Sequence, residues 1–193
     1  MAESPRKERS KQAILDATRE LLADDGGVGS LTVEAVAARS GVAKTTIYRQ
    51  WRDKWELALD AVMIDMLPGF RTPVDVGDTR KELMRFTNEA VRLLGSTQTG
   101  DVVRGLVSEL AAGPELARVY RERIVEPRIR DVQIIVDRGI ARGDLSPDTD
   151  ARVAHELMIG PIFYRLLFSG APLDRGLGAR AADAVLRTFA PTR

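Results

Sequence analysis

The chain has 193 residues, enough for one domain or for one domain with a smaller addition. Its 29 Lys and Arg residues nearly balance its 28 Asp and Glu residues, so the chain as a whole is not a strongly basic nucleic-acid binder. It contains no Cys and one His, which excludes disulfides, thiol catalysis and metal sites built from Cys or from several His ligands.

Two further features limit the location of the protein. The longest apolar run, residues 157–164, ends at Arg165 and is too short to cross a membrane as a helix. The N-terminus is charged and no long apolar stretch follows it, so it does not have the form of a signal peptide. We therefore expect a cytoplasmic protein with no membrane partner.

The N-terminal third has the apolar periodicity of short helices. Ser10 can cap a first helix, and Thr32 can cap a short second one. Gly41 permits a tight turn, Ile47 is the expected buried anchor of a third helix, and Asp53 can cap a fourth. The predicted helices of this part cover residues 10–25, 32–39, 43–50 and 53–67.

The rest of the chain is also predicted to be helical. Four helix breakers between Pro68 and Gly77 mark the clearest domain boundary. Beyond it, Pro127 must either kink its helix or start a new one, and we favour a kink. Residues 132–136 could form a strand, but the helical pattern continues through them. The predicted helices cover residues 78–94, 101–112, 115–142, 149–169 and 174–189, which gives an all-α protein of about nine helices.

Two short helices joined at a glycine turn have the arrangement of a helix-turn-helix, which places its second helix in the major groove of DNA. Charge supports this locally, because residues 13–38 carry a net −4 and residues 39–54 a net +4. The segment 1–9 is expected to be a flexible basic arm, which could be plain disorder or a DNA contact.

The candidate DNA-binding residues are polar or basic and lie on or beside the short helices. The first turn of the second short helix is expected to reach base edges, and residues one turn later are expected to bind phosphate oxygens, as is Lys54. Trp51 and Trp55 fit a core position better than stacking on DNA. The candidates are Thr32, Arg39, Lys44, Thr45, Thr46, Tyr48, Arg49 and Lys54.

Residues 31–54 contain LTVEAVAARSGV and, after Ala43, KTTIYRQWRDK. This stretch resembles the DNA-binding domain of the TetR family of one-component transcriptional repressors. The resemblance implies a three-helix DNA-binding domain at residues 10–60 and an effector-binding and dimerisation domain at residues 78–193. Three positions depart from the usual pattern: Ala43 replaces a capping Ser, Thr45 a frequent Gly, and Trp51 a Phe.

The effector site is expected among apolar and aromatic side chains of the C-terminal domain. Each of these side chains could instead be ordinary core, and His155 could be a packed or interface residue. Neither a cofactor nor a metal ion is expected. The candidate effector-binding residues are Phe86, Val107, Leu110, Tyr120, His155, Met158 and Phe163.

The last two predicted helices indicate a homodimer. Residues 157–168 are apolar almost all round, with Arg165 as the one charge, and such a helix must be covered on both sides. Two helices from each subunit would form a four-helix interface about a two-fold axis. Alternatively, the pair only closes the core of one chain. The candidate interface residues are Leu157, Tyr164, Phe168, Ala182, Val185 and Phe189.

These features together favour a homodimeric repressor of a palindromic DNA operator, released by a small-molecule effector. A ligand-independent or activating DNA-binding regulator is the alternative. An enzyme is disfavoured, because His155 alone could serve a triad and lies on a mostly apolar face. The glycines at positions 26–29 follow no predicted strand, unlike those of a nucleotide-binding loop.

Overall fold

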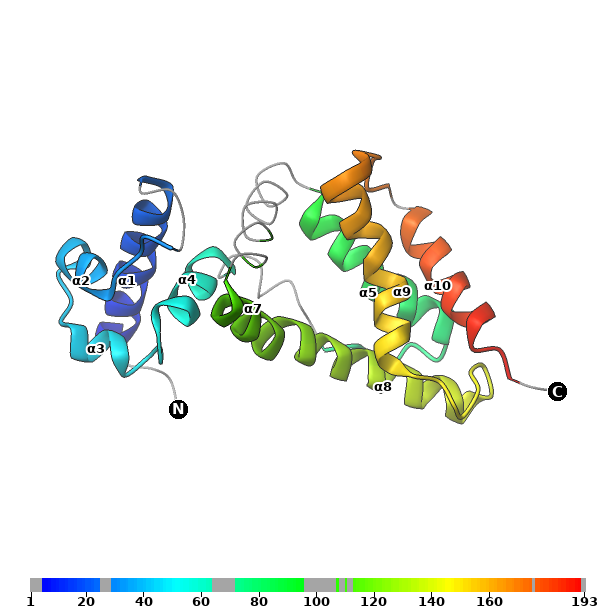
Figure 1. The fold of residues 1–193 in the computed structure, drawn as a ribbon. Coiled ribbons are helices and arrows are strands. Elements are labelled where there is room, and N and C mark those ends of the chain that lie inside the picture. The colour runs from blue at the N-terminus through cyan, green and yellow to red at the C-terminus, as the bar shows by residue number, and fades with distance from the viewer. Residues whose placement is uncertain are drawn as a thin grey trace. The chain divides into compact units, whose positions relative to one another are not determined.

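The computed structural model describes residues 5–24, 29–63, 72–95, 107, 110, 113–174 and 176–191. It is 76% helical, and the described residues contain no strand, which confirms the predicted all-α class (Figure 1). The contacts divide the chain into two compact units, residues 1–67 with 106–120 and residues 68–105 with 121–193. The first unit thus includes a segment that the predicted boundaries assign to the C-terminal domain. The predicted helix 101–112 lies outside the described residues except at Val107 and Leu110.

The first unit is a small helical cluster in which α1 packs on α2 and α4, and α4 packs on α7. Its core is formed by large apolar side chains that include Ile14, Leu15, Val36 and Leu57. The helices are α1 (Pro5–Asp24), α2 (Val33–Ser40), α3 (Lys44–Tyr48), α4 (Lys54–Met63) and α7 (Pro114–Tyr120).

Two details of this unit differ from prediction. Helix α1 begins at Pro5 rather than at the expected Ser10 cap, so residues 5–9 of the predicted flexible arm are helical. Helix α4 is described to Met63, and the predicted continuation over 64–67 lies outside the described residues.

The helix-turn-helix is set by local signals that the sequence already contains. The Thr32 hydroxyl accepts a hydrogen bond from the Ala35 amide at 3.1 Å and caps α2, as predicted. Gly41 ends α2 with a φ of 69°, a left-handed conformation that favours glycine, and its amide donates to the Ala37 carbonyl at 3.0 Å. Ala43 precedes α3 and supplies no side-chain cap.

The aromatic anchor after α3 is Trp51, which is only 2% exposed. Its indole Nε1 donates to Asp60 Oδ2 at 2.8 Å, so the buried polar edge has a partner on α4. The predicted cap Asp53 accepts from the Glu56 amide at 2.8 Å and starts α4. The core position expected for Trp51 is therefore confirmed, whereas Trp55 is only half-buried.

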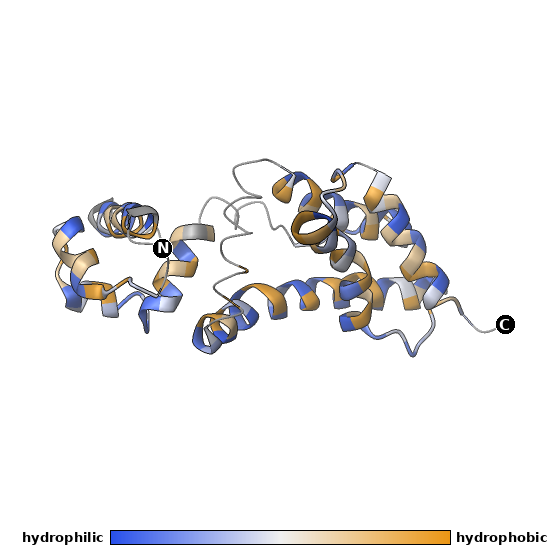
Figure 2. Ribbon diagram, turned by 45° about the horizontal axis from the view of Figure 1, so that its top comes forward, coloured by the Kyte–Doolittle hydropathy of each residue, from blue (hydrophilic) through white to orange (hydrophobic). Residues whose placement is uncertain are grey.

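In the second unit, α5 packs against α8, α9 and α10, and α9 also packs against α8 and α10. Figure 2 shows hydrophobic and hydrophilic residues alternating along these helices, as amphipathic helices require. Their shared core includes Leu83, Phe86, Ile135 and Met158. The helical elements are α5 (Thr79–Leu94), η2 (Arg121–Val125), α8 (Glu126–Arg142), α9 (Ala151–Tyr164), η3 (Arg165–Ser169) and α10 (Gly176–Thr188).

The chain remains helical through Pro127, in line with the favoured interpretation. A π-helical turn, η2, directly precedes α8, and Pro127 lies in the first turn of α8. Residues 132–136 are helical, which excludes the strand. Gly143 ends α8 with a φ of 77°, while α10 begins at Gly176, two residues later than predicted.

Candidate nucleic-acid interface and ligand region

Helix α3 has a buried side and an exposed side. Ile47 is 1% exposed and anchors the helix in the core. Lys44, Thr45, Tyr48 and Arg49 are all exposed, and Tyr48 keeps 53% of its surface. These four positions lie at i, i+1, i+4 and i+5, so they share one face of the helix.

The structure therefore groups four predicted DNA-binding residues on one surface. Thr46 is half-buried, since it lies on the side of α3 nearer to Ile47. Thr32 is exposed, but its hydroxyl oxygen already accepts the capping hydrogen bond of α2. The hydroxyl hydrogen of Thr32 can still donate to a phosphate oxygen and so position DNA, whereas the α3 face can reach base edges.

Two of the predicted basic residues are held in exposed ion pairs. Lys44 Nζ lies 3.0 Å from Glu34 Oε1, and Arg39 Nη1 lies 3.1 Å from Glu20 Oε2. The hydrogen bond between Lys44 and Glu34 lowers the pKa of Glu34 and raises that of Lys44, so both are charged at neutral pH. Because such exposed pairs are weak, DNA phosphates can compete for Lys44.

The Lys54 side chain makes two contacts within the protein that could not be predicted from its position in the sequence. Its Nζ donates to the Gly29 carbonyl at 2.8 Å and lies 4.6 Å from the centroid of the Trp55 ring. Lys54 therefore joins the start of α4 to the turn before α2. The sequence holds no local signal for this contact, because the partner is 25 residues away.

In the second unit, a pocket of about 150 Å³ lies between residues 72–74 and one face of α5. The α5 residues are spaced at i, i+3, i+4 and i+7, as expected for one helical face. Of the predicted effector-binding residues, Phe86 lines this pocket. The lining residues are Thr72, Pro73, Val74, Glu82, Arg85, Phe86 and Glu89.

Phe86 also connects the pocket to a buried polar cluster. The Arg128 guanidinium lies 4.3 Å from the centroid of the Phe86 ring, and the His155 ring meets it edge-on at 6.1 Å. Arg128 pairs with Asp131 at 2.8 Å and with Glu89 at 3.3 Å. Burial lowers the pKa of Arg128 and raises that of Asp131.

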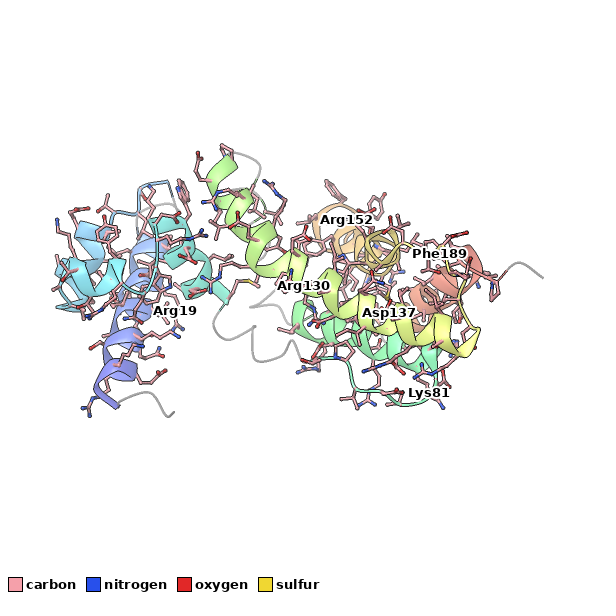
Figure 3. All side chains as sticks on the ribbon, turned by 90° about the horizontal axis from the view of Figure 1, so that it is seen from below. Arg19, Lys81, Arg130, Asp137, Arg152 and Phe189 are labelled. Carbon is pink, nitrogen blue, oxygen red and sulfur yellow. The ribbon has the colours of Figure 1, made fainter. Side chains whose placement is uncertain are left out.

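His155 is neutral at physiological pH. Burial, reinforced by the positive charges of Arg128 and Arg152, lowers the pKa of His155 to about 4. Arg152, labelled on α9 in Figure 3, is itself paired with Glu126 at 3.0 Å. The structure thus brings two of the predicted effector-binding residues, Phe86 and His155, into contact.

The other predicted effector-binding residues are divided between the two units. Met158 is fully buried in the core that contains Phe86, and Phe163 is half-buried. Tyr120, Val107 and Leu110 belong to the first compact unit. Burial raises the pKa of Tyr120 to about 12, which marks it as a packed side chain.

A network around Glu82 was not predicted from the sequence. The Glu82 side chain is fully buried and pairs with Arg142 at 2.9 Å and with Arg138 at 3.0 Å. Arg142 also pairs with Asp75 at 2.5 Å, and Arg138 donates to the Pro73 carbonyl at 3.2 Å. These bonds fasten residues 73–76 to α5 and α8. In the sequence, the i, i+4 spacing of Arg138 and Arg142 indicates that both side chains share one helix face, and this spacing could have pointed to the network.

The predicted dimer residues separate into exposed and buried groups. Tyr164 and Phe168 are 62% and 77% exposed, and their rings lie 5.9 Å apart. Leu157 and Phe189 are half-buried. Ala182 and Val185 are fully buried in the core of their own chain, which corrects their assignment, because they leave no surface for a second subunit.

The fold and these surfaces define a class of protein. A helix-turn-helix with an exposed polar and basic second helix precedes a separate helical unit with a ligand-sized pocket. This combination is that of a helix-turn-helix transcriptional regulator with a second helical domain.

Comparisons with known proteins give the family. Residues 14–61 match "Bacterial regulatory proteins, tetR family", and residues 73–185 match "Tetracyclin repressor-like, C-terminal domain". The chain belongs to the TetR family of transcriptional regulators. Regulators of this family bind DNA, and often small-molecule ligands, as dimers, and they are not enzymes.

Three similar proteins illustrate the match. The uncharacterized HTH-type transcriptional regulator YdeS of Bacillus subtilis is 32% identical over 96% of this chain and 90% of its own length. The DNA-binding transcriptional repressor TetR of Mycobacteroides abscessus is 28% identical over 94% of each chain. The crystal structure of the TetR family regulator SCO0332 has a TM-score of 0.70 and 27% identity, covering 94% of this chain and 99% of its own.

Within the described residues, no helix is long and apolar enough to cross a membrane. The same residues contain no group of three or more His, Asp or Glu side chains placed to hold a metal ion.

Proposed function

We propose that the protein is a homodimeric repressor that binds a palindromic operator and leaves it when a small molecule binds the second unit. The observation that carries this proposal is the exposed α3 face of Lys44, Thr45, Tyr48 and Arg49, anchored from behind by Ile47. The similarity to a DNA-binding transcriptional repressor supports repression over activation.

An exposed apolar stripe on α9 and η3 supports the dimer. Val153, Gly160, Tyr164 and Phe168 are exposed and recur at helical spacing, with half-buried Leu157 between them. An added Cβ at Gly160 would meet nothing within 4 Å, so this part of the stripe is open. Two exposed aromatic rings on one helix face are typical of a surface that a second subunit covers.

A dimer also supplies the specificity that one short reading helix lacks. Two copies of α3 about a two-fold axis would read two half-sites, spaced by a whole number of DNA turns. A ligand can favour a state in which the distance between the two α3 helices does not match the distance between the half-sites. Such a ligand weakens binding at both half-sites together. A 100-fold loss of DNA affinity requires a coupling free energy of about 2.7 kcal/mol.

A mobility-shift assay on the DNA upstream of the protein's own gene tests the reading surface. Arg49→Ala removes a basic side chain from the α3 face and is expected to weaken binding about 10-fold, with a shallower salt dependence. Arg130→Ala removes an exposed arginine from α8 and is the matched control, expected to bind as the wild type does. Equal effects of the two variants would contradict the proposed surface.

Analytical ultracentrifugation tests the dimer. Phe168→Glu places a charge in the apolar stripe and is expected to shift the protein from dimer to monomer. Val74→Glu places the same charge at another exposed apolar residue, 64% exposed, and is expected to leave the dimer intact. A wild-type protein that sediments as a monomer at micromolar concentration would overturn the proposal.

A further inference from the structure

The pocket on α5 has a size that limits its ligand. Its volume of about 150 Å³ matches that of an engineered protein cavity that accommodates benzene. It therefore fits a molecule of about one ring with a small substituent. Its apolar wall is formed by Pro73, Val74 and Phe86, which suits the faces of such a ring.

The two carboxylates of the pocket wall are already neutralised by the protein. Glu82 pairs with Arg138 and Arg142 at 3.0 and 2.9 Å. Glu89 pairs with Arg128 at 3.3 Å, and Arg128 is 8% exposed. A cationic ligand would have to compete with these arginines of α8, which are fixed within the fold.

Arg85 differs from the other charged residues of the wall. It lines the pocket from α5 and is exposed, and it has no ion-pair partner among the residues that the structure describes. A guanidinium offers two parallel N–H donors that match the two oxygens of a carboxylate. Thr72, across the pocket, adds a hydroxyl that can donate to the same group.

We propose that this pocket binds a small organic carboxylate that carries a single ring, with Arg85 as its anion-binding residue. The ring lies against Phe86, Pro73 and Val74, and the carboxylate points to the Arg85 guanidinium. Its role as effector rests on the proposed function, whereas the binding itself does not. Residues 72–74 belong to the chain segment between α4 and α5, so a ligand that contacts them acts on the covalent link to the DNA-binding unit.

Isothermal titration calorimetry of the full chain without DNA tests the site. The probes are benzoate, neutral benzamide and cationic benzylamine, which share the ring and differ in the substituent. We expect benzoate to bind and benzamide to bind roughly 10-fold to 100-fold more weakly, because it loses the charge-assisted pair. No binding of benzylamine is expected.

Two substitutions separate the role of Arg85 from general effects. Arg85→Ala is expected to reduce benzoate affinity at least about 10-fold, and Arg85→Glu to abolish benzoate binding and permit benzylamine. Arg92→Ala removes an exposed arginine from the same helix and is the matched control, expected to bind benzoate normally. Equal binding of benzoate and benzylamine to the wild type, or unchanged benzoate binding to Arg85→Ala, would overturn the proposal.

The DNA assay keeps this proposal distinct from the proposed function. If the protein binds benzoate through Arg85 but does not bind DNA, the proposed ligand site is supported and the proposed repressor function is overturned. Operator binding by a protein that does not bind benzoate would overturn the pocket assignment and leave the repressor intact.

Discussion

The wild-type protein is expected to become less stable in mild acid, in part because of His155. Replacement of His155 by Gln is expected to make the free energy of unfolding fall less between pH 7 and pH 5. Burial and the charges of Arg128 and Arg152 lower the pKa of His155 from its ordinary 6.5 to about 4. Between these values the unfolded chain binds a proton that the folded chain does not. Acidification from pH 7 therefore favours unfolding, and the stabilising contribution falls as the pH drops through 6.5 towards 4.

The shift sets the size of the effect. A shift from 6.5 to about 4 corresponds to about 3.4 kcal/mol at 1.36 kcal/mol for each pKa unit. The ring is only half-buried, so its charged form keeps part of its hydration. We therefore expect His155 to account for about 1 kcal/mol of destabilisation between pH 7 and pH 5.

Urea denaturation at pH 7 and pH 5 measures this contribution, at one fixed protein concentration because the protein is proposed to be dimeric. Asp and Glu residues also titrate in this range. The change in the free energy of unfolding between pH 7 and pH 5 is therefore compared between the wild type and His155→Gln. The variant is expected to lose about 1 kcal/mol less than the wild type. An equal loss in both proteins would refute the reasoning.

Three further predictions follow from the packing and charge of named residues. Glu82→Gln is expected to lower the free energy of unfolding, measured in urea, by about 2 kcal/mol, because it removes the buried carboxylate that pairs with Arg138 and Arg142. An unchanged urea midpoint would contradict a stabilising role for this network. Gly178→Ala is expected to cost about 1–3 kcal/mol, because the new Cβ would lie 2.6 Å from Asn88 Cγ, and Asn88→Ala should restore most of the loss. Additive losses in that double variant would contradict the clash. Glu34→Gln is expected to raise the affinity for any DNA and to steepen the salt dependence of binding, because it releases Lys44 from its ion pair and removes a negative charge. Fluorescence anisotropy measures both effects. Weaker binding by the variant would contradict this prediction and would mean that the ion pair orients Lys44 for DNA binding.

Features that depend on near neighbours in the chain were predictable. The capping role of Thr32 and the left-handed turns at Gly41 and Gly143 follow from residue types at fixed offsets from a periodic pattern. The exposed face of α3 follows from the same periodicity, because Ile47 is its buried anchor.

Features that depend on distant partners were not predictable. Lys54 had the right charge and position for a phosphate contact, but its ammonium binds the carbonyl of Gly29. Ala182 and Val185 lie on a clear apolar stripe, yet a stripe does not reveal whether it faces its own chain or another. Tyr120 is a candidate effector-binding residue on sequence grounds, whereas its contacts place it in the first unit.

The most direct test of the account is selection of preferred DNA sequences from a random pool, carried out with the wild type and with a Lys44→Ala, Thr45→Ala double variant. The account predicts a two-fold symmetric preferred sequence for the wild type, and altered base preference in each half-site for the variant, because these side chains occupy the exposed first turn of α3. Recovery of the same sequence by both proteins, or of no preferred sequence by the wild type, would contradict the assignment of α3 as the reading helix.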